Sequence, residues 1–532
     1  MKQNKITEMG KFLPYLILIP LSLSAFVHLW NPAGFPDIHG DEGHYIRRAI
    51  NIMMGGAAEE EKIPEPNRHY GNPFFGQIFL SSALTLTNYP NSIQIDGEVT
   101  ANSVAGLFFV PRIVMGVLAV IDTFLLYKIA ERRYNTSVAL AASILFAVMP
   151  FSWIIRRVFL ESIQLPFILS SIMFAIYFNK YSRSINSNNI SNKFNNGEMI
   201  IILISGIFLG LAIFTKIPAF IMIPLISFLI YSNNRHKGFN ALKIWLVPVI
   251  LIPSIWPVYA ILEGDADKWI DGLLWQTSRE GIGIQSLVGL FRVDAQLLVL
   301  GLAGSIYAIV IRKDVFCFLW IIPFLVFLTL IGLVRIHNYI PLLPIFCLAG
   351  GVLIADIYKL FRINKKSFKR ILITGSIIGA IGTFALLNAI LYIPSNANST
   401  YFEIYSFVVR KLPSYGIDGE NVNTTNRVTV VGSNWVISSF SWIPNTLYGN
   451  DHEFRTLDSN SKIKTEKVLL VIDKNMKRSL SDSTEQAKRF QSHQTQVKSL
   501  YDTMDIIAKF NLTASGVFKD TASGIIEIKS NY

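Results

Sequence analysis

Residues that could catalyse a group transfer are concentrated in one short polar segment near the N-terminus. In chain order they are Asp37, His39, Asp41, Glu42, His44 and Tyr45. A carboxylate can act as a general base, because it takes the proton that a hydroxyl nucleophile loses as it attacks. Asp41 and Glu42 are therefore the first catalytic candidates. Asp41 also stands where the N-cap of a following helix belongs, so it could instead satisfy the first amides of that helix.

The residues that follow predict the helix that positions these acids. Apolar side chains recur at helical spacing from Tyr45 to Met53, and Gly55-Gly56 ends the pattern. A helix with one apolar face of this kind can lie along a membrane surface. We expect it to hold Asp41 and Glu42 where the chain leaves the membrane.

Basic side chains form a second group of candidates. They are Arg156 and Arg157, which Glu161 follows, then Lys216, and then Arg335 and His337 with Tyr339 beside them. Charges in a lipid-embedded chain are costly unless they are paired or used. The two arginines could reach lipid head groups with Glu161 as their ion-pair partner. Alternatively, the whole set could bind the phosphate of a lipid-linked substrate, with Glu161 as an orienting acid.

Apolar runs long enough to cross a membrane must carry these residues. A span needs about 20 mostly apolar residues. We place about eleven runs, near residues 12–30, 103–127, 137–153, 159–178, 199–214, 217–231, 241–262, 295–311, 315–334, 338–357 and 371–393. The fifth and sixth could be one kinked element. The first could also be a signal peptide cut after Ala25.

Composition excludes a soluble enzyme. Of the 532 residues, 51% are hydrophobic and only 16% are charged, where a soluble protein has about 25% charged residues. A net charge of +12 would suggest nucleic-acid binding in a soluble chain. Here the basic residues cluster at alternate ends of the apolar runs, for example at Lys128–Arg133, Arg312–Lys313 and Lys359–Arg370. They therefore orient the protein in the membrane, and no nucleic-acid partner is expected.

The same charge pattern predicts the topology of a multi-pass plasma-membrane protein. The basic ends and the N-terminus face the cytoplasm, whereas the net-acidic loop 31–102 lies outside. We divide the chain into a transmembrane catalytic domain, residues 1–393, and an extracytoplasmic soluble domain, residues 394–532. Strands near 427–431, 467–472, 504–508 and 524–528 and a helix over 481–501 predict an α/β fold for the second domain.

Neither a disulfide nor a metal site is predicted. Cys317 and Cys347 both lie in apolar runs. The acids and histidines of loop 31–102, with His69 among them, have no metal-binding spacing, although a divalent metal stays an open alternative. Asn398, Asn423 and Asn511 begin three-residue patterns for N-glycosylation, which also occur by chance.

Five short motifs, in chain order, resemble those of the GT-C glycosyltransferases that use polyprenyl-phosphate sugars. They are Asp41-Glu42-Gly-His-Tyr45, Tyr70-Gly-Asn-Pro-Phe-Phe-Gly76, Arg156 followed by Glu161, Gly206-Ile-Phe-Leu-Gly210-Leu-Ala-Ile-Phe-Thr-Lys216, and His337-Asn-Tyr339-Ile-Pro341. The motifs resemble especially the branch that holds the protein O-mannosyltransferases and the lipid A aminoarabinose transferases. Two features depart from its pattern, namely Glu161 where Asp is usual and Asn72-Pro73-Phe74 where Pro-Pro-Leu is usual.

The resemblance implies transfer of a sugar, hexose- or mannose-like, from a polyprenyl (dolichyl or undecaprenyl) phosphate with inversion. The acceptor is a protein, lipid or glycan of the cell envelope. No cofactor is expected. We assign Asp41, Glu42 and Glu161 as catalytic, with Asp41 as the base. Arg156, Arg157, Lys216, Arg335 and His337 are candidates for the donor phosphate, and His44, Tyr45, His69 and Tyr339 for substrate binding.

Two alternatives remain at this stage. An oligosaccharyltransferase-type GT-C enzyme would be expected to carry a tryptophan-rich motif in its outer domain, where Trp435 and Trp442 are isolated. A transporter or lipid flippase should have polar residues near mid-membrane. Asp122 is the main residue of that kind, and it could equally be a buried partner for a hydroxyl or for Lys128.

Overall fold

A computed structural model of the chain describes residues 13–56, 70–93, 98–185, 194, 196–232, 235–278, 283–331, 334–363, 382–412, 427–444, 452–456, 463, 465–481, 491–512 and 524–532. These residues fall into two compact units, each assembled from separate parts of the sequence. Unit 1 consists of Met1–Trp30, Glu65–Phe79 and Ile113–Ile393. Unit 2 consists of Asn31–Pro64, Leu80–Arg112 and Pro394–Tyr532.

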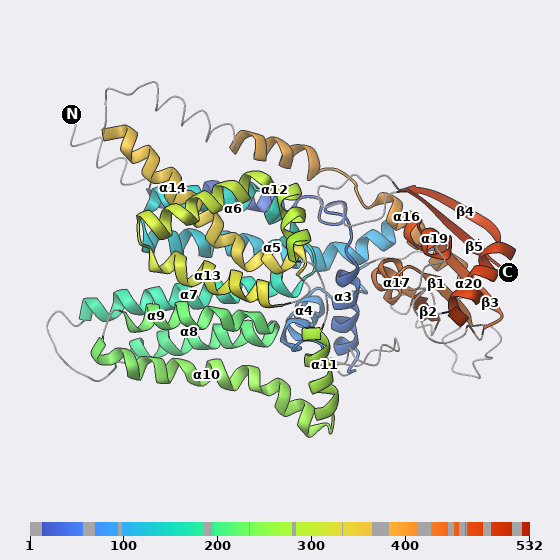
Figure 1. Cartoon of the computed structure of the whole chain (residues 1–532), viewed down its shortest axis with the longest axis horizontal. Coiled ribbons are helices and arrows are strands. Elements are labelled where there is room, and N and C mark those ends of the chain that lie inside the picture. The colour runs from blue at the N-terminus through green and yellow to red at the C-terminus, as the bar shows by residue number, and fades with distance from the viewer. Residues whose placement is uncertain are drawn as a thin grey trace. The chain divides into compact units, whose positions relative to one another are not determined.

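Apolar helices build unit 1 (Figure 1). Its helices include α2 (Leu18–Leu29), α6 (Thr136–Val148), α7 (Leu160–Ile185), α8 (Asn196–Thr215), α9 (Ile223–Tyr231), α10 (Arg235–Leu262), α11 (Ala266–Ser278), α12 (Gly283–Ile306), α13 (Val315–Leu330), α14 (Leu343–Ile363) and the helix Gly382–Tyr392. Short 3₁₀ turns precede several of them, at Leu13–Ile17, Pro150–Arg156, Ile217–Met222 and Ile336–Leu342. Two helices, α4 (Phe75–Leu86) and α5 (Ala101–Arg133), each contribute residues to both units.

The chain is a multi-pass membrane protein. Within the described residues, six helices are long and apolar enough to cross a membrane, or seven if the bent pair Thr136–Val148 and Pro150–Arg156 is one span. Other predicted runs form shorter apolar helices, such as Tyr15–Leu29, Ile217–Tyr231 and Val315–Leu330. The first ten runs are thus helical where they are described, but the count of eleven spans is not confirmed. Part of the eleventh, at 371–381, lies outside the described residues.

Glycines allow the helices of unit 1 to approach closely. A Cβ at Gly206 of α8 would lie 2.5 Å from the carbonyl oxygen of Trp245 in α10, and one at Gly210 would lie 2.6 Å from that of Pro248. Small residues at such positions bring membrane helices together without a side chain between their backbones. The glycines of the fourth sequence motif therefore hold α8 against α10, and this fixes the helix that ends just before Lys216.

Asp122 is an exception among the buried side chains of α5. It is fully buried, and neither carboxylate oxygen has a hydrogen-bond partner among the described residues. The interpretation of Asp122 as a partner for a hydroxyl or for Lys128 is therefore wrong. The Lys128 ammonium instead pairs with Glu131, at 3.1 Å.

A five-stranded sheet forms the core of the C-terminal part of unit 2 (Figure 1). Its strands are β1 (Val428–Gly432), β2 (Glu453–Thr456), β3 (Lys467–Ile472), β4 (Asp505–Leu512) and β5 (Gly524–Ser530). The order is β2-β1-β3-β5-β4; β2, β1 and β3 are parallel, whereas β5 is antiparallel to both β3 and β4. The helices are α16 (Ser399–Lys411), α17 (Asn434–Phe440), α19 (Lys474–Ser481) and α20 (Gln491–Thr503).

The predicted α/β fold of this region is confirmed. Its four predicted strands correspond to β1, β3, β4 and β5, because alternating or fully buried β-branched runs are recognisable in the sequence. Strand β2 was not predicted, since its four residues include two charged ones. The predicted helix over 481–501 corresponds to α20, and residues 482–490 lie outside the described part of the chain.

Candidate functional site

The first acidic segment begins helix α3 (Gly40–Met53), as predicted, and the helix stops before Gly55, whose φ of +79° favours glycine. The N-cap, however, is His39. The His39 side chain accepts from the backbone N–H of Asp41, and the Glu42 carboxylate accepts from the backbone N–H of His39 at 2.9 Å. The alternative that Asp41 serves as the cap is therefore wrong, and its carboxylate is not needed to begin the helix.

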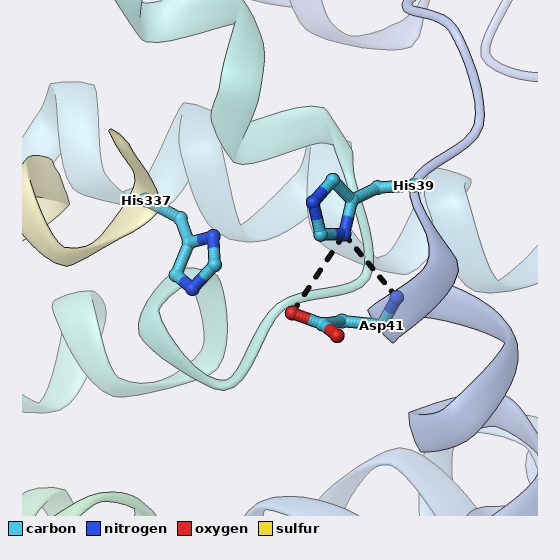
Figure 2. Close-up of side chains that lie close together, drawn as sticks. All are labelled: His39, Asp41 and His337. Atoms are coloured by element: carbon cyan, nitrogen blue, oxygen red, sulfur yellow. Dashed lines mark hydrogen bonds and ion pairs between the residues drawn. The ribbon is translucent and has the colours of Figure 1, made fainter. Parts of the chain in front are cut away.

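Asp41 and His39 lie side by side at this helix end (Figure 2). The distance from His39 Nδ1 to Asp41 Oδ2 is 3.7 Å, and about a third of the Asp41 side chain is exposed. His39 Nδ1 also accepts the Asp41 backbone N–H at 3.2 Å, which ties the imidazole to the start of the helix. The Asp41 carboxylate keeps its access to solvent.

Glu42 has a different environment, although it is the next residue. Its side chain is fully buried against Arg112 of α5, which donates to Oε2 from Nε at 2.8 Å and to Oε1 from Nη2 at 2.7 Å. Arg112 also donates to the carbonyl oxygens of Pro32 and Pro36, at 3.0 and 2.8 Å. Glu42 thus positions the loop before α3 and the start of that helix.

Asn398, which precedes α16, holds the same loop. Its side chain is buried; it donates to the carbonyl oxygens of Ala33 and Pro36 at 2.7 and 2.8 Å, and it accepts from the N–H of Ile38 at 2.9 Å. Because the amide nitrogen is buried and bonded, Asn398 cannot serve as the glycosylation acceptor that its sequence pattern indicates. Asn511 is exposed on β4, and Asn423 lies outside the described residues.

Helix α17 packs directly on α3 in unit 2. A Cβ at Gly43 would lie 2.7 Å from the carbonyl oxygen of Ser439 and 2.9 Å from Nε1 of Trp442, and one at Gly40 would lie 2.6 Å from Oγ of Ser438. The two glycines beside the acidic pair therefore allow this close contact. The packing of α17 therefore fixes the helix that carries Asp41.

In unit 1, a buried carboxylate brings two of the basic candidates together. Glu161 is 2% exposed, and its Oε1 accepts from the Lys216 ammonium and, at 3.2 Å, from Nδ2 of Asn338. His337 Nε2 lies 3.8 Å from the same oxygen. The other carboxylate oxygen of Glu161, Oε2, has no hydrogen-bond partner among the described residues. Three of the five sequence motifs thus meet at Glu161.

Neighbouring contacts fix the Lys216 backbone and join a fourth motif to this cluster. The Gln164 side chain donates to the carbonyl oxygens of Lys216 and Ala212. A Cβ at Gly76, the last residue of the second motif, would lie 2.6 Å from the Leu160 side chain and 3.1 Å from that of Thr215. The motifs therefore pack together through the residues that directly precede Glu161 and Lys216.

The remaining basic candidates of unit 1 differ in burial. Arg156 and Arg157 are both fully buried, and Nη2 of Arg156 donates to the carbonyl oxygen of Trp30 at 2.5 Å. Arg335, by contrast, is exposed. The hydroxyl of Tyr339, which is 3% exposed, lies 3.2 Å from that of Ser286.

Among the other predicted binding residues, His44 Nδ1 lies 3.4 Å from Nη2 of Arg47, and the ring of His44 contacts that of the buried Tyr45. His69 lies outside the described residues. The sequence prediction missed Arg112, although an arginine inside an apolar run is costly and therefore informative. It also missed the hydrogen-bonding roles of Asn338 and Asn398, because their partners lie far away in the sequence.

Comparison with known proteins gives a match to a family model over part of the chain, and a fold. Residues 104–261 match the family model described as dolichyl-phosphate-mannose-protein mannosyltransferase. The structure superposes on ArnT from Cupriavidus metallidurans with a TM-score of 0.57 at 9% identity, covering 99% of this chain and 98% of that one. The chain has the GT-C glycosyltransferase fold. The prediction of a polytopic GT-C chain with a C-terminal α/β domain is therefore confirmed.

Two further structures share this fold. ArnT bound to undecaprenyl phosphate gives a TM-score of 0.53 at 11% identity, with 99% of this chain and 98% of that one covered. The archaeal oligosaccharyltransferase AglB from Archaeoglobus fulgidus, in complex with an inhibitory peptide and a dolichol-phosphate, gives 0.52 at 12% identity. The match covers 81% of this chain but only 64% of AglB. No curated protein sequence matches the chain.

Proposed function

We propose that the protein is a membrane glycosyltransferase that moves a sugar from a polyprenyl phosphate to a hydroxyl acceptor on the extracytoplasmic side. The family match over residues 104–261 and the GT-C fold support the lipid-linked donor. The bound undecaprenyl phosphate of ArnT is consistent with it. The charge pattern of the loops supports a plasma-membrane protein with a cytoplasmic N-terminus.

The observation that carries the mechanism is the different environment of the two neighbouring acids. Glu42 is fully buried and bonded to Arg112, whereas Asp41 keeps about a third of its side chain exposed. A general base must reach the proton that it removes. We therefore assign the base to Asp41, and we assign to Glu42 the task of positioning it.

The chemical step is an inverting displacement. The acceptor oxygen attacks the anomeric carbon, its proton passes to Asp41, and the bond between that carbon and the phosphate oxygen breaks. The polyprenyl phosphate leaves with the bonding electrons, so that negative charge grows on the phosphate. Fixed cations stabilise such a charge in the transition state.

Among the cations of unit 1, we assign Lys216 to the donor phosphate first, because its ammonium is held in place by a hydrogen bond. Its ammonium has three N–H donors, of which Glu161 takes one. Glu161 thereby orients Lys216, and a nearby His337 adds positive charge when it is protonated. Arg156, Arg157 and Arg335 remain candidates for the same task.

The decisive experiment measures sugar transfer in membranes that contain the full-length protein, with a panel of polyprenyl-phosphate sugars as donors. We expect Asp41→Asn to lower transfer at least 100-fold, because general-base catalysis contributes about 10²–10⁴. Asp271→Asn, an exposed acid of α11, is the matched control and should leave transfer unchanged.

A second measurement separates the base from the phosphate site. Undecaprenyl monophosphate should bind the Asp41→Asn protein as tightly as the natural one, whereas Lys216→Gln should weaken binding about tenfold or more. Full transfer by Asp41→Asn would exclude Asp41 as the base. Undiminished lipid binding by Lys216→Gln would exclude the proposed phosphate role of Lys216.

A further inference from the structure

Unit 2 contains an open cavity of about 330 Å³ that none of the residues assigned to sugar transfer lines. Its wall includes Thr100, which directly precedes α5, then Glu403, Ser406, Phe407 and Arg410 of α16, and Phe510 of β4. The volume is in the range of small-molecule sites, which are about 300–1,000 Å³. The cavity can therefore hold one or two sugar rings.

One face of α16 supplies most of the wall. Ser406 and Phe407 each lie three or four residues from both Glu403 and Arg410, which places the four residues on the same side of a helix. The Phe407 ring meets that of Phe510 with a centroid distance of 5.8 Å and an interplanar angle of 68°. The two rings form an apolar patch, and the charged ends of Glu403 and Arg410 lie one turn away on either side along α16.

The charged groups of this wall are available to a ligand. Both Glu403 and Arg410 are exposed. Nε of Arg410 donates to the carbonyl oxygen of Ser406 at 3.3 Å, which leaves the outer guanidinium nitrogens to other partners. Nη1 lies 3.6 Å from the carboxylate of Glu98, which is 83% exposed. A surface pair of this kind contributes little free energy. A ligand can therefore replace Glu98 at small cost.

A saccharide fits this combination of groups best. Each sugar hydroxyl can donate to the Glu403 carboxylate or accept from the Arg410 guanidinium. The C–H face of a pyranose ring is apolar and can cover a phenyl ring, which removes apolar surface from water. A phosphate would instead meet the negative charge of Glu403, and a lipid chain would use neither charged side chain.

We propose that this cavity is a saccharide-binding subsite, which holds the glycan part of the acceptor while its hydroxyl reacts elsewhere. The assignment to the acceptor rests on the proposed transferase function, but saccharide binding itself does not. The subsite gives the C-terminal α/β region, through α16 and β4, a part in the choice of acceptor.

Binding is tested on the full-length protein in detergent, without donor, by saturation-transfer NMR. The probes are the methyl glycosides of mannose, glucose and galactose and their β-linked disaccharides. We expect at least one probe to bind, and Glu403→Gln and Arg410→Gln each to weaken it about tenfold. Lys509→Gln is the matched control, because Lys509 precedes Phe510 on β4 and points to the other face of the sheet. It should bind as the natural protein does.

Each outcome decides the proposal. Binding by none of these saccharides overturns it, as does an equal loss in Glu403→Gln and Lys509→Gln. If instead a short acceptor peptide binds and depends on Glu403 and Arg410, the ligand is a peptide and the proposal is wrong. Asp41→Asn should keep full saccharide binding, so failure of the proposed catalytic role leaves this test unaffected.

Discussion

The ion pair between Arg112 and Glu42 gives the sharpest prediction about the acidic segment. Replacing Arg112 by Met removes two donors to the carboxylate and two to the carbonyl oxygens of Pro32 and Pro36. Glu42 then stays fully buried without its counter-charge. Breaking a buried pair on one side costs about 3–5 kcal/mol, which is a large part of the stability of a domain.

The matched experiment is a double-mutant cycle measured by thermal unfolding of the purified full-length protein. We expect Arg112→Met and Glu42→Leu each to lower the Tm of unit 2 by about 10 °C, on the scale of 2–4 °C per kcal/mol for a unit of this size. The double variant should lose much less than the sum, because no uncompensated charge remains.

Transfer activity should behave differently from stability in the same cycle. The double variant no longer ties the loop before α3 to α5, so we expect transfer to stay low even where the Tm recovers. Additive losses of Tm, or no loss in Arg112→Met, would refute the reasoning that the pair stabilises this loop.

Three further predictions concern other parts of the molecule. Asn398→Ala should destabilise unit 2 by about 2 kcal/mol or more, since it leaves buried backbone groups unpaired; Asn398→Asp should be at least as harmful, because its carboxylate faces two carbonyl oxygens. In intact cells, a membrane-impermeant maleimide should label Lys509→Cys but not the natural protein, whose Cys317 and Cys347 are buried; absence of labelling would contradict the predicted topology. Transfer should survive exhaustive treatment with EDTA, because cationic side chains can stabilise the phosphate; loss of activity and rescue by one divalent ion would contradict this.

Much of the fold could be predicted because it depends on local patterns. Apolar residues recur with a helix or strand period over short stretches of sequence, and this pattern is enough to predict an element. It predicted the apolar runs, the helix after Asp41 with its glycine stop, and four of the five strands. The prediction was weaker where a span is short or bent. In the pair formed by α6 and the turn Pro150–Arg156, the bend is 65°, and hydropathy alone does not distinguish one broken span from two.

The candidate site was predictable only in part. The sequence determined that the acids and cations occupy the ends of apolar segments, because chain connectivity places them there. Only the tertiary structure decided what each one does. Asp41 and Glu42 are neighbours in sequence, but Glu42 is bonded to an arginine 70 residues away.

The same distinction holds for Glu161 and for the loop before α3. Asn338, a partner of Glu161, is 177 residues distant from it, and the Asn398 side chain reaches a backbone N–H 360 residues away. No local periodicity encodes such contacts, because they depend on how separate helices pack. The sequence alone therefore determined which residues could do chemistry, and the packing decided which carboxylate is buried in an ion pair and which stays accessible, as the proposed base must be.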